Sequence, residues 1–263
     1  MGRLDITNIL RDWEYDPERT VRILEGDDGR DLLQVRLPLG VEQYELTGRP
    51  DGRKPHGHET EIAYVEQRLK QHIVQNGSDV GFEISTQQAE LLQAEGILFY
   101  YRYLILYQIR RYNHVVSDTE HNLHLCDLLE RYCADEEARD SVLQFRPYIL
   151  RMHGASSALA IEAGNRDGDP FDVLHNTIER IEALEVIDSP AFQFERIRSV
   201  NYLRAVERKI QSGAPDIEAD GDDLGTAVSQ SNLETELRRA VENEDYERAA
   251  EIRDRIRRMN DNV

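Results

Sequence analysis

The chain has 263 residues, of which 40% are hydrophobic and 32% charged, so it is long enough for more than one small domain and its surface is heavily ionised. Its formal net charge of −19 opposes attraction to nucleic acid and to anionic membranes, since both depend on Lys and Arg contacts to phosphate. We therefore expect neither a direct nucleic-acid partner nor a membrane partner.

The two cysteines and the apolar runs suggest a compartment. Cys126 and Cys133 lie two helical turns apart in the sequence, a rise of about 10 Å on one helix. That separation is too large for a disulfide. The sequence shows neither an apolar N-terminal leader nor a run of about 18 apolar residues that would span a membrane. We expect a cytoplasmic protein with reduced cysteines.

Residues 1–58 are predicted to form a lead-in and a small antiparallel β meander. Apolar and polar residues alternate over residues 20–25, 31–37 and 41–46, and Asp28-Gly29 provides the turn between the first two runs. The side chains expected to face inward are Val21, Ile23, Leu33, Val35, Leu37, Val41 and Tyr44.

Residues 59–211 are predicted to form a helical body. Apolar residues recur at helical spacing, and Ser or Asp stands at several starts as an N-cap. Pro147 is expected to mark a kink or a boundary. The expected helices cover residues 59–76, 85–112, 119–132, 135–153, 156–163, 170–184 and 190–210. Their arrangement is either an irregular bundle or a set of tetratricopeptide-like helix pairs.

Residues 212–230 differ from the body in composition. They contain three glycines and no Lys or Arg, together with five acids: Asp216, Glu218, Asp220, Asp222 and Asp223. Such a segment buries too little apolar surface to offset the entropy of ordering it. We predict a flexible acidic linker.

Residues 231–263 regain helical periodicity and predict a C-terminal two-helix hairpin. A polar turn at residues 242–245 separates two apolar stripes. Two short helices cannot enclose a core, so their stripes must be covered by something else. The residues expected to bind a partner are Leu237, Ala240, Val241, Tyr246, Ala249, Ala250, Arg253 and Ile256.

The run from Leu237 to Ile256 resembles the UVR motif of bacterial excision-repair subunits. It has that pattern's Leu, its Ala followed by an aliphatic residue, its aromatic residue after Asp245, and the paired alanines Ala249 and Ala250. The resemblance covers about an eighth of the chain. The rest resembles bacterial proteins of unassigned activity that carry this motif at their C-terminal end.

The resemblance implies a non-enzymatic adaptor or regulator that acts by protein docking. Its partner would be another UVR-bearing protein or a second copy of the chain. The other readings are an enzyme that uses a pocket of the helical body and an accessory DNA-repair protein that acts through protein contacts. The hairpin could also pack back onto its own body.

The sequence carries none of four common catalytic signatures. The sequence lacks GxxxxGK[ST], GxGxxG, GxSxG and HExxH, and we expect no enzyme, cofactor or metal site. His121 and His124 share a helix face, but two ligands do not make a zinc site. Some UVR-bearing kinase activators carry paired CxxC zinc sites, which this sequence lacks. The aromatic run at residues 99–103 is expected to belong to the core and its rim rather than to a nucleotide-stacking surface.

Overall fold

The computed structural model describes residues 5–213, which belong to one compact unit of the chain. The predicted C-terminal hairpin and the predicted linker beyond Gly213 lie outside the described residues. Within residues 5–213, no helix combines the length and the apolar character needed to cross a bilayer.

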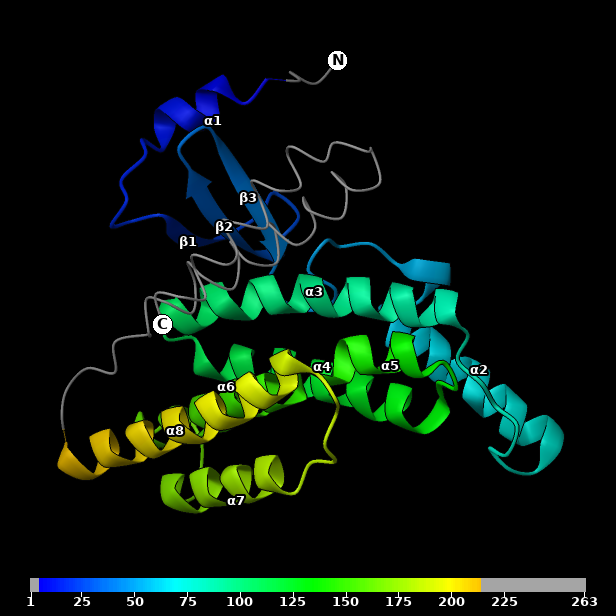
Figure 1. Cartoon of the computed structure of the whole chain (residues 1–263). Coiled ribbons are helices and arrows are strands. Elements are labelled where there is room, and N and C mark those ends of the chain that lie inside the picture. Colours follow the sequence, from blue (N-terminus) through cyan, green and yellow to red (C-terminus); the bar gives the residue numbers. More distant parts are fainter. Residues whose placement is uncertain (1–4, 214–263) are drawn as a thin grey trace, which may run out of the picture. The chain divides into compact units, whose positions relative to one another are not determined.

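The described residues are mainly helical and begin with a small sheet, which confirms the predicted fold class (Figure 1). The strands are β1 (Val21–Glu25), β2 (Asp31–Leu37) and β3 (Gly40–Glu45). The helices are α1 (Thr7–Asp12), the short 3-10 turn η1 (Pro55–Gly57), α2 (Glu61–Asn76), α3 (Thr86–Gln108), α4 (Tyr112–Tyr132), α5 (Glu136–Leu143), α6 (Arg146–Glu162), α7 (Pro170–Glu182) and α8 (Pro190–Ser212).

The predicted meander is confirmed as an antiparallel sheet of order β1-β2-β3. Gly29 has a φ of 78°, which the turn between β1 and β2 requires. Leu33 is fully buried and pairs with Tyr44, so both side chains lie on one face.

Two residues expected on the inward face of the sheet are not there. Val41 pairs with Arg36, which places it on the opposite face from Leu33. Leu37 is 39% exposed because it pairs with Gly40 at the turn where β2 ends. The second face is also covered: Arg36 is buried, and its guanidinium donates to the carbonyl of Trp13 at 2.7 Å.

Most predicted helix starts are confirmed by their N-caps. The Thr60 hydroxyl accepts from Ala63 N, and the Ser85 hydroxyl accepts from Gln88 N. Asp169 and Ser189 cap α7 and α8 in the same way, each followed by a proline in the first turn.

Four predicted helix boundaries are wrong: the end near residue 112, the start at 119, the end near 153 and the start at 156. α3 ends at Gln108, and Arg110 has a φ of 60°, which breaks the helix before Tyr112. α4 therefore begins seven residues before the predicted start at residue 119. Pro147 lies in the first turn of α6, so it marks a helix boundary, one of the two predicted alternatives. α6 then continues through Gly154 to Glu162 instead of ending near residue 153.

The helices form an irregular bundle. α4 lies between α3 and α6, and α6 also contacts α7 and α8, which contact each other (Figure 1). α6, α7 and α8 touch one another in all three pairings. A second part of the core, between α2, α3 and α4, centres on Val65, Leu92 and Leu129.

Gly154 allows the close approach of α6 and α7. A Cβ at this position would lie 2.5 Å from the Thr177 hydroxyl oxygen and 2.6 Å from Thr177 Cγ2. We expect Gly154→Ala to lower the free energy of unfolding by about 1–3 kcal/mol, because overpacking outweighs the better helix propensity of alanine. Urea denaturation followed by circular dichroism measures this. Adding Thr177→Ala should restore part of the loss; no loss in the single variant would contradict the close contact.

Candidate functional site: a buried polar network

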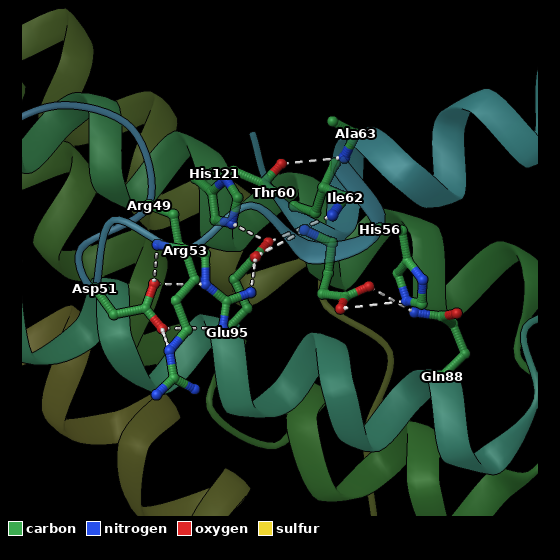
Figure 2. Close-up of polar contacts among 11 residues, drawn as sticks. Arg49, Asp51, Arg53, His56, Thr60, Ile62, Ala63, Gln88, Glu95 and His121 are labelled. Carbon is green, nitrogen blue, oxygen red and sulfur yellow. Dashed lines mark hydrogen bonds and ion pairs between the residues drawn. The ribbon is translucent and has the colours of Figure 1, made fainter. Parts of the chain in front are cut away.

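All of the residues predicted to bind a partner lie outside the described residues: Leu237, Ala240, Val241, Tyr246, Ala249, Ala250, Arg253 and Ile256. Within residues 5–213, charged and polar side chains converge instead between α3, α4, the start of α2 and the loop after β3. We call this set the Glu95 network, and Figure 2 shows its central contacts. Its side chains are those of Glu95, Arg49, Asp51, His56, Glu61, Gln88 and His121.

Glu95 on α3 is fully buried and accepts from several donors. Its Oε2 atom accepts from Arg49 Nη1 at 2.8 Å and from the backbone N–H of Glu61 at 2.7 Å. Its Oε1 atom accepts from the backbone N–H of Ile62 at 3.3 Å. The first N–H groups of a helix have no partner within the helix, so this carboxylate supplies acceptors at the positive end of α2.

His121 approaches the same carboxylate from α4. Its Nε2 atom lies 3.1 Å from Glu95 Oε1. Its ring stacks on Phe99 of α3, with centroids 3.6 Å apart and an 8° angle between planes. The neighbouring Asn122 donates to the carbonyl of Gly96 at 3.0 Å. These contacts fix α4 against α3 next to the buried carboxylate.

Arg49 links the network to the Gly- and Pro-rich loop after β3. Its Nε atom donates to Asp51 Oδ1 at 2.8 Å, and Asp51 also accepts from the backbone N–H of Arg53. Burial acts to raise the pKa of Asp51, but the hydrogen bonds from Arg49 and Arg53 outweigh it and hold that pKa below its ordinary value. The loop is thus held to α3 through one guanidinium.

Glu61 extends the network toward the surface. Its Oε2 atom accepts from Gln88 Nε2 at 3.1 Å, so Gln88 bonds to α2 instead of reaching back to its own helix cap. His56 Nε2 lies 3.9 Å from Glu61 Oε1, and the His56 ring stacks on Tyr64 at 4.0 Å. His56 has a φ of 51°, a left-handed conformation that these contacts help to hold.

A second buried ion pair lies along the same two helices. Arg102 of α3 donates to Asp118 of α4 through Nε at 2.9 Å and Nη2 at 2.6 Å. Its Nη1 atom donates to the carbonyl of Glu45 at 2.7 Å, which ties the end of β3 to the bundle. Removal from water raises the pKa of Asp118, and the Arg102 guanidinium opposes this shift.

The contacts of Glu95 and Asp118 hold separate segments of the chain together. The carboxylates of Glu95 and Asp118 already accept hydrogen bonds from groups of the chain itself. The donors to Glu95 come from the loop after β3 and from the start of α2. The Arg102 guanidinium, which pairs with Asp118, also donates to the carbonyl of Glu45, so the Glu95 and Asp118 centres hold the loop, α2 and the sheet to the α3–α4 pair. A buried carboxylate in such a fully engaged state is costly to disrupt.

His121 and His124, which share a face of α4, contact different carboxylates. His121 faces Glu95, whereas His124 Nε2 lies 2.9 Å from Glu66 Oε1. Cys126 is buried, and burial raises the pKa of its thiol to about 12. Cys126 and Cys133 are both free thiols, which confirms the prediction that they form no disulfide. Over residues 5–213, no group of three or more His, Cys, Asp or Glu side chains is placed to hold a metal ion.

The aromatic run at residues 99–103 belongs to the core and its rim, as predicted. Phe99 and Tyr103 are buried, and Tyr100 and Tyr101 are half-buried. The sequence prediction did not identify Glu95 or Arg102 as anchors. Both lie at helical spacing from the apolar residues Leu92, Phe99 and Leu106, and a charge on a buried face requires a partner, which is the signal that could have identified them.

The comparison with protein families concerns the C-terminal segment. Residues 228–261 match the UvrB/uvrC motif, UVR, which confirms the resemblance seen in the sequence. The match includes every residue predicted to bind a partner, from Leu237 to Ile256. Searches of curated proteins and of solved structures found no match. The motif is a protein–protein interaction module.

Proposed function

Because residues 228–261 carry a UvrB/uvrC motif, we propose that the protein is a non-enzymatic adaptor that recruits a protein partner through this segment. The motif match is the observation that carries the proposal. The apolar residues Leu237, Val241 and Ile256 would supply affinity, and Arg253 would fix the register of docking. The partner is either another UVR-bearing protein or a second copy of the chain.

The described body supports this role by its construction. Its most buried carboxylates, Glu95 and Asp118, are engaged by donors of the chain itself, so they stabilise a rigid carrier. The acidic composition of residues 212–230 favours a linker, and a linker keeps a docking segment at high local concentration near whatever the body holds. We propose that the body positions the segment and performs no reaction.

A role in DNA repair is a second candidate, and the motif itself favours it. The match is to a motif named for two repair proteins, UvrB and UvrC. The net charge of −19 makes direct contact with DNA unfavourable, so the link to repair would run through a protein. Binding of bare DNA at physiological salt would contradict this reading.

The docking proposal is tested with the full-length chain as bait and purified UvrB and UvrC as prey, alongside sedimentation of the chain alone. We expect Tyr246→Asp and Ala249→Glu each to weaken the association by about thirtyfold, the effect of losing a contact worth about 2 kcal/mol at the centre of an interface. Tyr246→Phe should retain binding because it keeps the aromatic ring.

Asn260→Asp is the charge-matched control. It adds one negative charge outside the predicted stripe and should bind like the unmodified chain. Association with UvrB, UvrC or a second copy that is unchanged in both charged variants would refute the proposal. So would the absence of all three associations.

A further inference from the structure

The outward face of α8 has a composition that the proposed function does not use. α8 contacts α6 and α7 through buried residues that include Phe192, Leu203 and Val206. From Phe194 on, the residues exposed along its other side recur every three or four positions, and together with Gln193 they form one stripe. We call this set the α8 stripe: Gln193, Phe194, Ile197, Asn201, Arg204, Arg208 and Gln211.

The first half of the α8 stripe is apolar. Phe194 is 49% exposed and Ile197 is 66% exposed, three residues apart on one side of the helix. Single exposed apolar residues are ordinary, but two large ones side by side on a helix suit the packing of another helix. Arg198 places its guanidinium carbon 5.7 Å from the Phe194 ring centre, which adds positive charge beside this apolar half.

The second half of the α8 stripe is cationic. Arg204 and Arg208 follow at helical spacing, and no residue of the stripe is acidic, although the chain contains 51 acidic residues. Arg204 approaches one carboxylate, Glu182, at 3.6 Å, with both side chains about half exposed. Arg208 forms no ion pair with any other residue in the described range, 5–213.

The two carboxylates of α8 are engaged elsewhere. Glu207 lies 2.8 Å from His175 of α7, and Glu195 lies 3.8 Å from the buried Arg151 of α6. Both point toward the bundle, so neither lies on the outward stripe, and the one carboxylate that approaches the stripe is Glu182, beside Arg204. Apolar residues followed by Arg204, whose one ion pair is about half exposed, and by Arg208 fit a partner that has apolar residues followed by carboxylates.

We propose that the α8 stripe is a docking surface for a helix of another protein, whose apolar residues cover Phe194 and Ile197 and whose Asp or Glu residues meet Arg204 and Arg208. From Phe194 to Arg208 the stripe rises about 21 Å, which a partner helix of about four turns would match. An antiparallel second copy of α8 would set Arg208 against Phe194 and leave the cation without a carboxylate. The stripe is made of residues other than those of the C-terminal motif, so we infer that an adaptor would have a second surface for a partner.

The probe is a fluorescent synthetic helix of about 18 residues, with leucines at helical spacing in one half and glutamates in the other. Fluorescence anisotropy with the full-length chain should show binding that weakens as salt rises. A matched peptide with lysine in place of glutamate should bind at least about tenfold more weakly, since like charges oppose Arg204 and Arg208.

Ile197→Glu and the pair Arg204→Glu with Arg208→Glu should each weaken binding of the acidic peptide by about tenfold or more. Val74→Glu is the matched control, because Val74 is an 84% exposed apolar residue on α2. Equal binding of both peptides, or full binding by Ile197→Glu, would overturn the proposal. Self-association of the chain that Ile197→Glu abolishes would assign the stripe to a second copy and overturn it too. These substitutions leave the C-terminal motif intact, so the result is independent of the test with UvrB and UvrC.

Discussion

Glu95→Ala is expected to lower the free energy of unfolding by about 3–5 kcal/mol, because it removes the buried acceptor of two backbone N–H groups and of one guanidinium N–H, although Arg49 keeps its ion pair with Asp51. The variant would leave Arg49 without its buried acceptor and expose two N–H groups at the start of α2 to an apolar surrounding. Urea denaturation gives the size of the loss. Circular dichroism follows the helices, and the fluorescence of Trp13 follows the sheet region, where Arg22 covers its ring.

The Glu95 variant has a matched control on the same helix. Glu90 is exposed on α3, so Glu90→Ala should change the free energy of unfolding by less than about 0.5 kcal/mol. Glu95→Gln should fall between the two, because the amide retains one acceptor oxygen but presents donors to N–H groups. A Glu95→Ala variant as stable as Glu90→Ala would show that the network contributes nothing to the fold.

The sequence predicted those elements whose signals are local. Alternation over residues 20–25 and 31–37 located β1 and β2, and the side chains of Asp169 and Ser189 located the starts of α7 and α8. A cap or an alternating run depends on neighbours only a few residues away, so no tertiary information was needed.

Most of the wrong helix boundaries lie where segments distant in the sequence determine the local structure. A glycine in the sequence suggests a helix end. Gly154 instead lies within α6, where Thr177 of α7 leaves no room for a Cβ. The break between α3 and α4 falls at Arg110, a residue type with no turn preference. The wrong face assigned to Val41 is instead a local error, because residues 41 and 44 differ by an odd number and cannot share one side of a strand.

The Glu95 network could be anticipated only in part. A charge at helical spacing from apolar residues, such as Glu95 or Arg102, must have a partner, and that much is visible in the sequence. The partners themselves come from loops and helices separated along the chain: Arg49 precedes Glu95 by 46 residues. Pairing at such separation depends on how α3, α4 and the loop after β3 pack, which periodicity does not encode.

Breaking the ion pair between Arg102 and Asp118 should destabilise the fold about as much as Glu95→Ala. This pair also allows a single variant to be compared with a double variant. Arg102→Met alone is expected to lower the free energy of unfolding by about 3–5 kcal/mol, since it leaves the buried Asp118 carboxylate without its guanidinium. Arg131→Met is the control, because Arg131 and its partner Asp79 lie at the surface. Loss of an exposed pair of that kind costs at most about 1 kcal/mol.

Combining Arg102→Met with Asp118→Leu distinguishes the cost of the unpaired buried charge from the loss of the other contacts of Arg102. Replacing both members of a buried ion pair by apolar residues removes the isolated charge, so the double variant should be more stable than Arg102→Met. Some loss should remain, about 1–3 kcal/mol, because Arg102 also donates to the carbonyl of Glu45 at the end of β3. If the double variant is less stable than Arg102→Met, the buried charge is not the main cost. If it is as stable as the unmodified chain, the bond to Glu45 does not hold the sheet to the bundle.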